Sequence, residues 1–247
     1  MLKNKLEEKQ CIGVFSKTTD SSFVEAAGYS GLDFMILDME HGPITLETLQ
    51  NHVRAAKISG MSSIIRVKDN SSHSIGSALD TGADGVQIPN ISTVEQAVDA
   101  VKSARFYPEG ERGVCRFVRA ANFGIIEKDK YFNEANKKVL ILQVEGAEGV
   151  GNIEGILAVK GIDIIFIGPY DLSQSMGVPG NITSPLVTDK IIEIVNKAKS
   201  KGIYVGCFTD TFDNMAWLKS LNVNYIAYSV DINIYQEKLL EVVNYGK

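Results

Sequence analysis

Polar side chains that could do chemistry recur directly after short apolar runs of this sequence. They are Asp38, Glu40, His41, Arg66, Gln87, Gln143, Glu145 and Asp171. Burying an unpaired charge costs on the order of several kcal/mol. We therefore expect these groups to meet one another, a metal ion or a ligand.

Two carboxylates at neighbouring run ends suit a hard divalent cation. Glu145 ends one run, and Asp171 follows the next. Mg²⁺ and Mn²⁺ sites often use one or two carboxylates and leave positions for substrate and water. The alternative is that both groups are rim carboxylates paired with Arg66.

His41 and Arg66 each have two interpretations. A lone histidine is usually a satisfied loop residue, but beside Asp38 and Glu40 it suits general base catalysis. The planar fork of Arg66 suits a substrate carboxylate or a developing enolate oxygen, or it simply neutralises acids. Asp80 lies at a predicted helix end, shortly before a glycine, and its usual interpretation there is a solvated surface acid.

The apolar runs are short, rich in Val, Ile and Phe, and show little polar alternation. This is typical of parallel strands buried on both faces. The runs span residues 12–15, 34–39, 63–67, 85–89, 139–144, 162–167, 204–208 and 225–230.

Helical patterns alternate with these runs. They span residues 22–27, 46–59, 74–81, 93–104, 147–159, 185–201, 211–220 and 235–243. Eight strand–helix units predict a (β/α)₈ TIM barrel, and we expect one domain over residues 1–247. A doubly wound open sheet is the competing architecture. In a barrel, the polar run ends would meet at the carboxyl ends of the strands.

Composition narrows the class of partner. The net charge of −5 argues against nucleic acid or an anionic membrane as a partner. The charged N-terminal stretch does not resemble a signal peptide. Three widely spaced cysteines predict neither a disulfide framework nor a zinc site. We expect a cytoplasmic protein.

Several motifs together resemble the HpcH/HpaI family, the class II pyruvate aldolases. They are FMILDMEHGP (34–43), IIRV (64–67), LDTGADGVQIP (79–89), YPEGERGV (107–114), QVEG (143–146) and FIGPYDLSQSMG (166–177). Their order and spacing cover nearly the whole chain.

The resemblance implies a barrel assembled as a homo-hexamer, a trimer of dimers, whose C-terminal helix is exchanged between subunits. It implies reversible cleavage of a 4-hydroxy-2-oxo acid to pyruvate and an aldehyde. The cofactor implied is a divalent metal (Mg²⁺, Mn²⁺ or Co²⁺), which stabilises the pyruvate enolate.

Site roles also follow from the resemblance. Glu145 and Asp171 match the family's metal-binding carboxylates, and Gln143 matches the amide beside them. Arg66 matches the arginine that binds and stabilises the enolate.

The proton-transfer group implied by the resemblance is His41 with Asp38 and Asp80. Arg119 and Phe208 align with positions near the aldehyde end of the substrate. Backbone groups from Gly168 through Pro169 and Tyr170 to Asp171 match the wall that holds the pyruvate carboxylate.

One departure concerns the acceptor. Many relatives carry small residues after Val114, where this chain has Cys-Arg-Phe-Val-Arg (115–119), and the two arginines of this loop, Arg116 and Arg119, would suit an acidic acceptor. The alternative is that Arg116 points to solvent or to a neighbouring subunit. A Claisen-type synthase or a citryl- or malyl-CoA lyase would reuse the same enolate machinery. A non-catalytic barrel that binds a keto acid is the third hypothesis.

Overall fold

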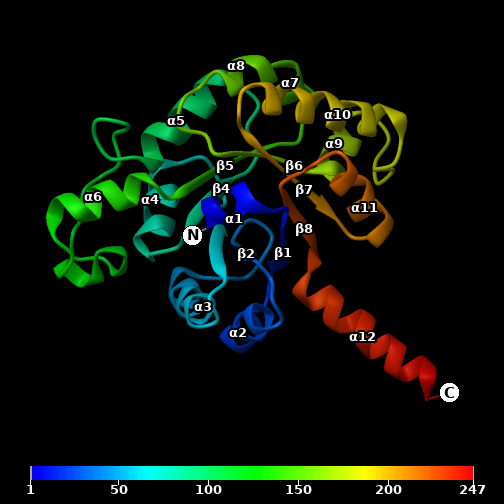
Figure 1. The fold of residues 1–247 in the computed structure, drawn as a ribbon, viewed down its shortest axis with the longest axis horizontal. Helices are drawn as coiled ribbons and strands as arrows, with labels where there is room; N and C mark the ends of the chain where they lie inside the picture. Colours follow the sequence, from blue (N-terminus) through cyan, green and yellow to red (C-terminus); the bar gives the residue numbers. More distant parts are fainter. Residues whose placement is uncertain (1, 247) are drawn as a thin grey trace.

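A computed structural model describes residues 2–246 and shows a closed barrel of eight parallel strands, ordered β1 to β8 around the ring (Figure 1). The strands are β1 (Cys11–Ser16), β2 (Phe34–Asp38), β3 (Ser62–Arg66), β4 (Gly85–Ile88), β5 (Val139–Val144), β6 (Ile164–Ile167), β7 (Tyr204–Thr209) and β8 (Tyr225–Val230). The TIM-barrel prediction is confirmed, and the open sheet is excluded.

One helix, α1 (Leu2–Glu8), precedes β1, and the other helices follow strands and surround the barrel (Figure 1). These others are α2 (Ser21–Tyr29), α3 (Leu46–Ile58), α4 (Ser72–Asp80), α5 (Val94–Ala104), α6 (Lys128–Asn136), α7 (Ala147–Gly151), α8 (Ile153–Leu157), α9 (Pro169–Ser175), α10 (Pro185–Ser200), α11 (Phe212–Ser220) and α12 (Asp231–Tyr245). A 3₁₀ segment, η1 (Arg119–Gly124), lies in the long connection before α6.

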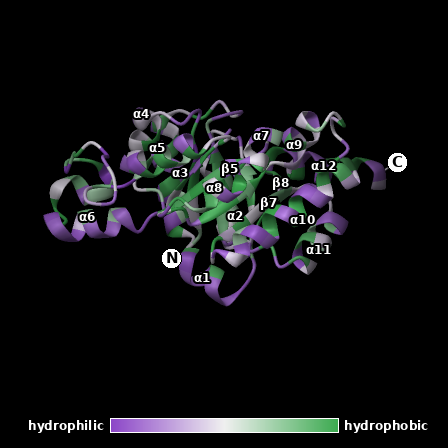
Figure 2. Cartoon of the chain, turned by 90° about the horizontal axis from the view of Figure 1, so that it is seen from above, coloured by the Kyte–Doolittle hydropathy of each residue, from purple (hydrophilic) through white to green (hydrophobic). Residues whose placement is uncertain are grey.

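Two apolar cores hold this arrangement together. Successive strand residues point to opposite faces. Inward side chains such as Phe34, Phe166 and Tyr225 fill the barrel, and Phe34 stacks on Tyr225 with ring centroids 3.7 Å apart. Outward side chains such as Met35 and Leu37 pack against the helices. Figure 2 shows the hydrophobic strands at the centre of the molecule and hydrophilic segments around them.

Local sequence sets the helix boundaries. The Thr93 side chain accepts from the backbone N–H of Gln96, whose own side chain accepts in return, which forms a capping box at the start of α5. Gly60 and Gly161, which lie between a helix and the following strand, have φ angles of +74° and +100°. Only glycine adopts this region without strain, so it directs the chain back toward the next strand.

The connections differ from the prediction in several places. The helix expected over residues 147–159 is two short helices, because the chain leaves helical geometry at Asn152 (φ −93°, ψ 5°). The final helix begins at Asp231, before the expected residue 235. Sequence periodicity did not reveal α1, α6 or α9, which are only seven to nine residues long.

Two segments extend from opposite sides of the barrel. The connection that carries η1 and α6 extends on one side, and α12 extends on the other (Figures 1 and 2). Among residues 2–246, no helix is long and apolar enough to cross a membrane. The predicted exchange of α12 between subunits stays a prediction.

Candidate active site

Four of the eight polar run-end residues line a cavity of 270 Å³ at the carboxyl ends of the strands, and the other four contact Arg66 or Gln143. Five polar side chains line it: Lys17, His41, Arg66, Gln143 and Asp171. Its aromatic wall consists of Phe15, Phe166, Tyr170 and Phe208. In TIM barrels this end of the strands carries the chemistry.

One side of the cavity is a buried ion network around Arg66. Nε and Nη2 of Arg66 each lie 2.8 Å from a carboxylate oxygen of Asp38, in a bidentate pair. Arg66 Nη1 lies 3.0 Å from Glu40 Oε2. The guanidinium also lies over the ring of Phe15, 4.6 Å from its centroid. Arg66 is thus held rigidly and keeps its remaining N–H groups for a ligand.

Burial shifts the pKa values of these acids in opposite directions. Burial alone would raise the pKa of Asp38, but the hydrogen bonds and charge of Arg66 outweigh it and hold that pKa below its usual value. Burial raises the pKa of Glu40, and the positive charge of Arg66 opposes the rise only in part.

A chain of amides leads to the second buried carboxylate. Gln87 donates to the Gln143 Oε1 at 2.5 Å, and Gln143 donates from Nε2 to Glu145 Oε2. The backbone N–H of Asn90 donates to Glu145 Oε1 at 2.9 Å. Burial still raises the pKa of Glu145 to about 7, and the nearby negative charges of Asp171 and Glu40 add to the effect.

The donor set fits a hard divalent cation. Glu145 is 5% exposed, and the negative charge of Asp171 contributes to its raised pKa, an effect that a bound cation would relieve. Gly168 leaves room for this carboxylate, because a Cβ there would lie 2.6 Å from Glu145 Oε2. Residues 2–246 contain no group of three or more acidic, His or Cys ligands. Two carboxylates with open positions are the pattern that Mg²⁺ uses when a substrate completes the site.

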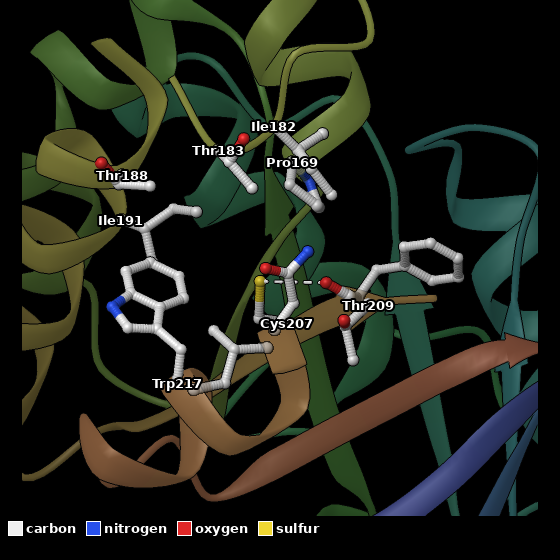
Figure 3. Close-up of a pocket in the computed structure, with 11 residues that line it drawn as sticks. Pro169, Ile182, Thr183, Thr188, Ile191, Cys207, Thr209 and Trp217 are labelled. Atoms are coloured by element: carbon white, nitrogen blue, oxygen red, sulfur yellow. Dashed lines mark hydrogen bonds between the residues drawn. The ribbon is translucent and has the colours of Figure 1, made fainter. Parts of the chain in front are cut away.

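Aromatic side chains separate this site from a neighbouring cavity of 210 Å³. Phe208 lies 5.9 Å from Phe15 and 6.0 Å from Tyr170 between ring centroids, and the Tyr170 hydroxyl donates to Asp210. Figure 3 shows the neighbouring cavity, with Cys207 of β7 and Trp217 of α11 among the residues that line it. No charged side chain lines it, so the polar chemistry belongs to the first cavity.

The structure does not bring every expected residue to the cavity of this chain. Asp80 ends α4, whose last turn lies at the opposite end of the barrel, and it accepts a 2.5 Å hydrogen bond from Arg112 rather than joining His41. Arg119 donates to the carbonyl oxygen of Thr81. Arg116 donates to backbone carbonyls within its own loop. Arg116 and Arg119 belong to the long connection outside the barrel, where they donate to backbone carbonyls, and Asp80 belongs to α4, where it accepts from Arg112.

Sequence reasoning missed two contributors, Lys17 and Asn90. Lys17 lines the cavity, and it follows β1 directly because that strand extends one residue beyond the predicted run. Asn90 joins Glu145 to Glu40, since its Nδ2 donates to Glu40 Oε1 at 3.2 Å. Its φ of +58° is a region that asparagine tolerates better than most residues. Their position in the sequence could have identified them, since Lys17 follows β1 and Asn90 follows β4. Glu40 was noticed only as a neighbour of His41.

Comparison with known proteins identifies the class. The model of the HpcH/HpaI aldolase/citrate lyase family matches residues 11–235. The chain belongs to this family, and its class is that of the aldolases, which are carbon–carbon lyases. The expectation drawn from the motifs is confirmed.

Two relatives and two solved structures illustrate the family. The chain is 35% identical to 5-keto-4-deoxy-D-glucarate aldolase of Shigella dysenteriae, over 91% of this chain and 88% of the relative. It is 35% identical to 2-keto-3-deoxy-L-rhamnonate aldolase of Escherichia coli K12, over 92% and 85%. A family member from Burkholderia cenocepacia superposes with a TM-score of 0.93 at 29% identity, covering 98% of this chain and 97% of the other. The citrate synthase SbnG gives 0.90 at 27% identity, covering 100% and 98%.

Proposed function

We propose that this chain reversibly cleaves a 4-hydroxy-2-oxo acid to pyruvate and an aldehyde in the cavity at the carboxyl ends of the strands. The observation that carries the proposal is the pair Glu145 and Asp171 beside the rigid guanidinium of Arg66. In this reaction the C3–C4 bond breaks, its electron pair stays on the pyruvate half as an enolate, and the C4 hydroxyl loses a proton.

Glu145 and Asp171 would hold the divalent metal, with Mg²⁺, Mn²⁺ and Co²⁺ as the candidates. Once bound, this ion supplies Lewis acidity at the carboxylate and keto oxygens of the pyruvate half. Gln143 fixes Glu145 through its hydrogen bond, so the carboxylate is already oriented. The backbone from Gly168 to Asp171 would form the wall for the pyruvate carboxylate.

Arg66 would stabilise the charge that develops on the enolate oxygen. Asp38 and Glu40 hold its guanidinium in one position, so little reorganisation is needed during the reaction. His41 stands at the cavity mouth with a side chain 62% exposed, and its Nε2 lies 3.9 Å from Glu40 Oε1. In this place His41 would take part in removing the proton of the C4 hydroxyl.

Pyruvate release tests the proposal. Metal-stripped protein would be given 2-keto-3-deoxy-L-rhamnonate and 5-keto-4-deoxy-D-glucarate, with and without Mn²⁺, and pyruvate would be measured by a coupled reductase. We expect release only with metal, and loss of release in Glu145→Gln. Glu95→Gln, which changes an exposed acid on α5, is the matched control and should behave as wild type. Metal-independent release would contradict the proposal.

A Claisen-type reaction is the second candidate, favoured by the similarity to the citrate synthase SbnG. It would use the same enolate-stabilising groups with oxaloacetate or an acyl thioester. Citrate formation or thiol release, with no cleavage of hydroxy-keto acids, would establish this alternative. The non-catalytic barrel is disfavoured because Glu145, Asp171, Arg66 and His41 are all present. Keto-acid binding without any metal-dependent reaction would establish the non-catalytic barrel.

The assembly is a further part of the proposal. α12 extends from the barrel with exposed apolar side chains along its length, which supports exchange of this helix within a homo-hexamer. The side chains are Ile232, Tyr235, Leu239, Leu240, Val242 and Val243. Light scattering during size-exclusion chromatography should give six times the 27.0 kDa chain mass. A monomeric mass would contradict this assembly.

A further inference from the structure

Lys17 is a cation of the cavity to which the proposed reaction assigns no role. It follows β1 and lines the same cavity as His41, Tyr170 and Phe208. In the closed ring of eight strands, β1 lies opposite β5, which leads to Glu145. The cavity thus reaches from Gln143 and Asp171 to Lys17, so Lys17 lies within the same cavity as a substrate whose pyruvate half would sit at Glu145 and Asp171.

The backbone around Lys17 is fixed by a buried acid. Asp231, 8% exposed, accepts from the backbone N–H of Lys17 at 3.1 Å and from the Ser16 hydroxyl at 2.7 Å. It also accepts from the Thr18 hydroxyl at 3.2 Å, and the carbonyl of Thr18 lies 2.9 Å from His52 Nε2. Lys17 thus leaves a rigid loop, and only its own side chain needs to be ordered by a ligand.

The ammonium group of Lys17 takes part in one long ion pair within the described part of the chain and makes no hydrogen bond there. Its nearest acid oxygen is Asp38 Oδ2 at 3.8 Å, which is too long for a hydrogen bond. Asp38 is already neutralised by the two hydrogen bonds from Arg66. In the described part of the chain, Lys17 Nζ makes no hydrogen bond, so its three donors are free for a ligand.

Lys17 differs from the other cations of the site in its hydrogen bonding. A divalent cation would offset two carboxylates and Arg66 bridges two more, whereas Lys17 Nζ makes no hydrogen bond in the described part of the chain. The carboxylates are Asp38, Glu40, Glu145 and Asp171. We propose that Lys17 binds the distal carboxylate of the substrate, so that the enzyme prefers 4-hydroxy-2-oxo diacids and releases an aldehyde that carries a carboxylate. This inference rests on the proposed aldolase function.

The structure assigns this role to Lys17 rather than to the two arginines that the sequence suggested. Arg116 and Arg119 donate to backbone carbonyls of the outer connection and do not line the cavity of this chain. Lys17 combines a cavity position with free donors, which neither arginine does.

Equilibrium binding tests the inference without turnover. The probes are 2-oxoglutarate, which has a distal carboxylate, and 2-oxopentanoate, which lacks one, titrated calorimetrically into the Mn²⁺-loaded protein. Lys17→Met should weaken 2-oxoglutarate binding by about tenfold or more and leave 2-oxopentanoate binding nearly unchanged, since the lost contact is charge-assisted. Lys160→Met removes an exposed lysine elsewhere and should match wild type for both probes. Equal weakening of both probes, or of neither, would overturn the inference.

Turnover gives the second readout. The ratio of kcat/KM for an acidic aldehyde acceptor (succinic semialdehyde) to that for a neutral one (propanal), each with pyruvate, should fall about tenfold or more in Lys17→Met. Lys17→Arg keeps the charge and should keep most of the preference. An unchanged ratio, in protein that exchanges pyruvate protons with solvent only when metal is present, would refute the role of Lys17 alone. Absence of that exchange in wild type would instead refute the proposed function.

Discussion

Replacing Asp38 by asparagine would test the buried ion network that holds Arg66. Asp38 is fully buried and accepts two hydrogen bonds of 2.8 Å from Arg66. It also accepts from the backbone N–H groups of Glu40 at 3.1 Å and His41 at 3.3 Å. The asparagine oxygen can keep some of these contacts, but the charge that compensates the buried guanidinium is lost.

Removing one partner of a buried ion pair costs about 3–5 kcal/mol. Glu40 stays 3.0 Å from Arg66 Nη1 and compensates part of the charge, so the lower end of this range applies. We expect Asp38→Asn to lower the free energy of unfolding by about 3 kcal/mol at pH 7. Typical domains have about 5–15 kcal/mol, so the variant should still fold.

The assay is urea unfolding followed by circular dichroism and by the fluorescence of Trp217, the single tryptophan. Asp99→Asn, on the exposed face of α5, is the matched control. Because the folded pKa of Asp38 is lowered, its contribution is complete above the unfolded pKa of about 3.9 and is lost as the pH falls through the folded pKa. The difference between wild type and variant should therefore shrink below about pH 4. A difference below about 1 kcal/mol at pH 7, or one independent of pH, would refute this account of Arg66.

Other predictions use separate parts of the molecule. Cys115 is exposed, whereas burial raises the pKa of Cys11 to about 11 and that of Cys207 to about 12, so one thiol per chain should react quickly with a maleimide. A second fast thiol, or fast reaction in Cys115→Ser, would contradict this assignment. Asp231→Ala should lower the free energy of unfolding by about 2–3 kcal/mol in urea unfolding, because buried donors of the loop after β1 lose their acceptor; a change near zero would show that the loop is held otherwise. Glu145→Gln should weaken Mn²⁺ binding, measured by electron paramagnetic resonance, by at least about tenfold, and unchanged affinity would remove Glu145 from the metal site.

The barrel could be predicted from the sequence because the local patterns of apolar residues agree with the strands and helices that form. Buried parallel strands require continuous apolar runs, and each of the eight runs overlaps an observed strand. The prediction of one helix over residues 147–159 was wrong near its middle, where the structure has a break at Asn152. There Asn152 donates to the carbonyl of Ser92, and this contact between distant residues has no counterpart in helical periodicity. The short helix α6 likewise depends on tertiary packing, of Phe106 against Tyr131 and Phe132.

The site could be predicted where a residue's place on a strand decides its position. Arg66 is the last residue of β3 and Gln143 is the next-to-last residue of β5, and both line the cavity. Lys17 was not predicted because the expected first strand ended at residue 15, one residue before the end of β1. Lys17 therefore did not stand directly after a predicted strand. Arg119 lies in the long connection, whose course is set by packing rather than by strand register. The resemblance therefore placed it by alignment alone.

Proton exchange at C3 of pyruvate tests the central claim most directly. Pyruvate in D₂O would be followed by NMR with metal-stripped protein, with and without Mg²⁺, Mn²⁺ or Co²⁺. We predict loss of the methyl signal only when metal is added, and no loss in Glu145→Gln or Arg66→Ala. Exchange without metal, exchange retained in Glu145→Gln, or no exchange with any metal would contradict a metal-assisted enolate at this cavity.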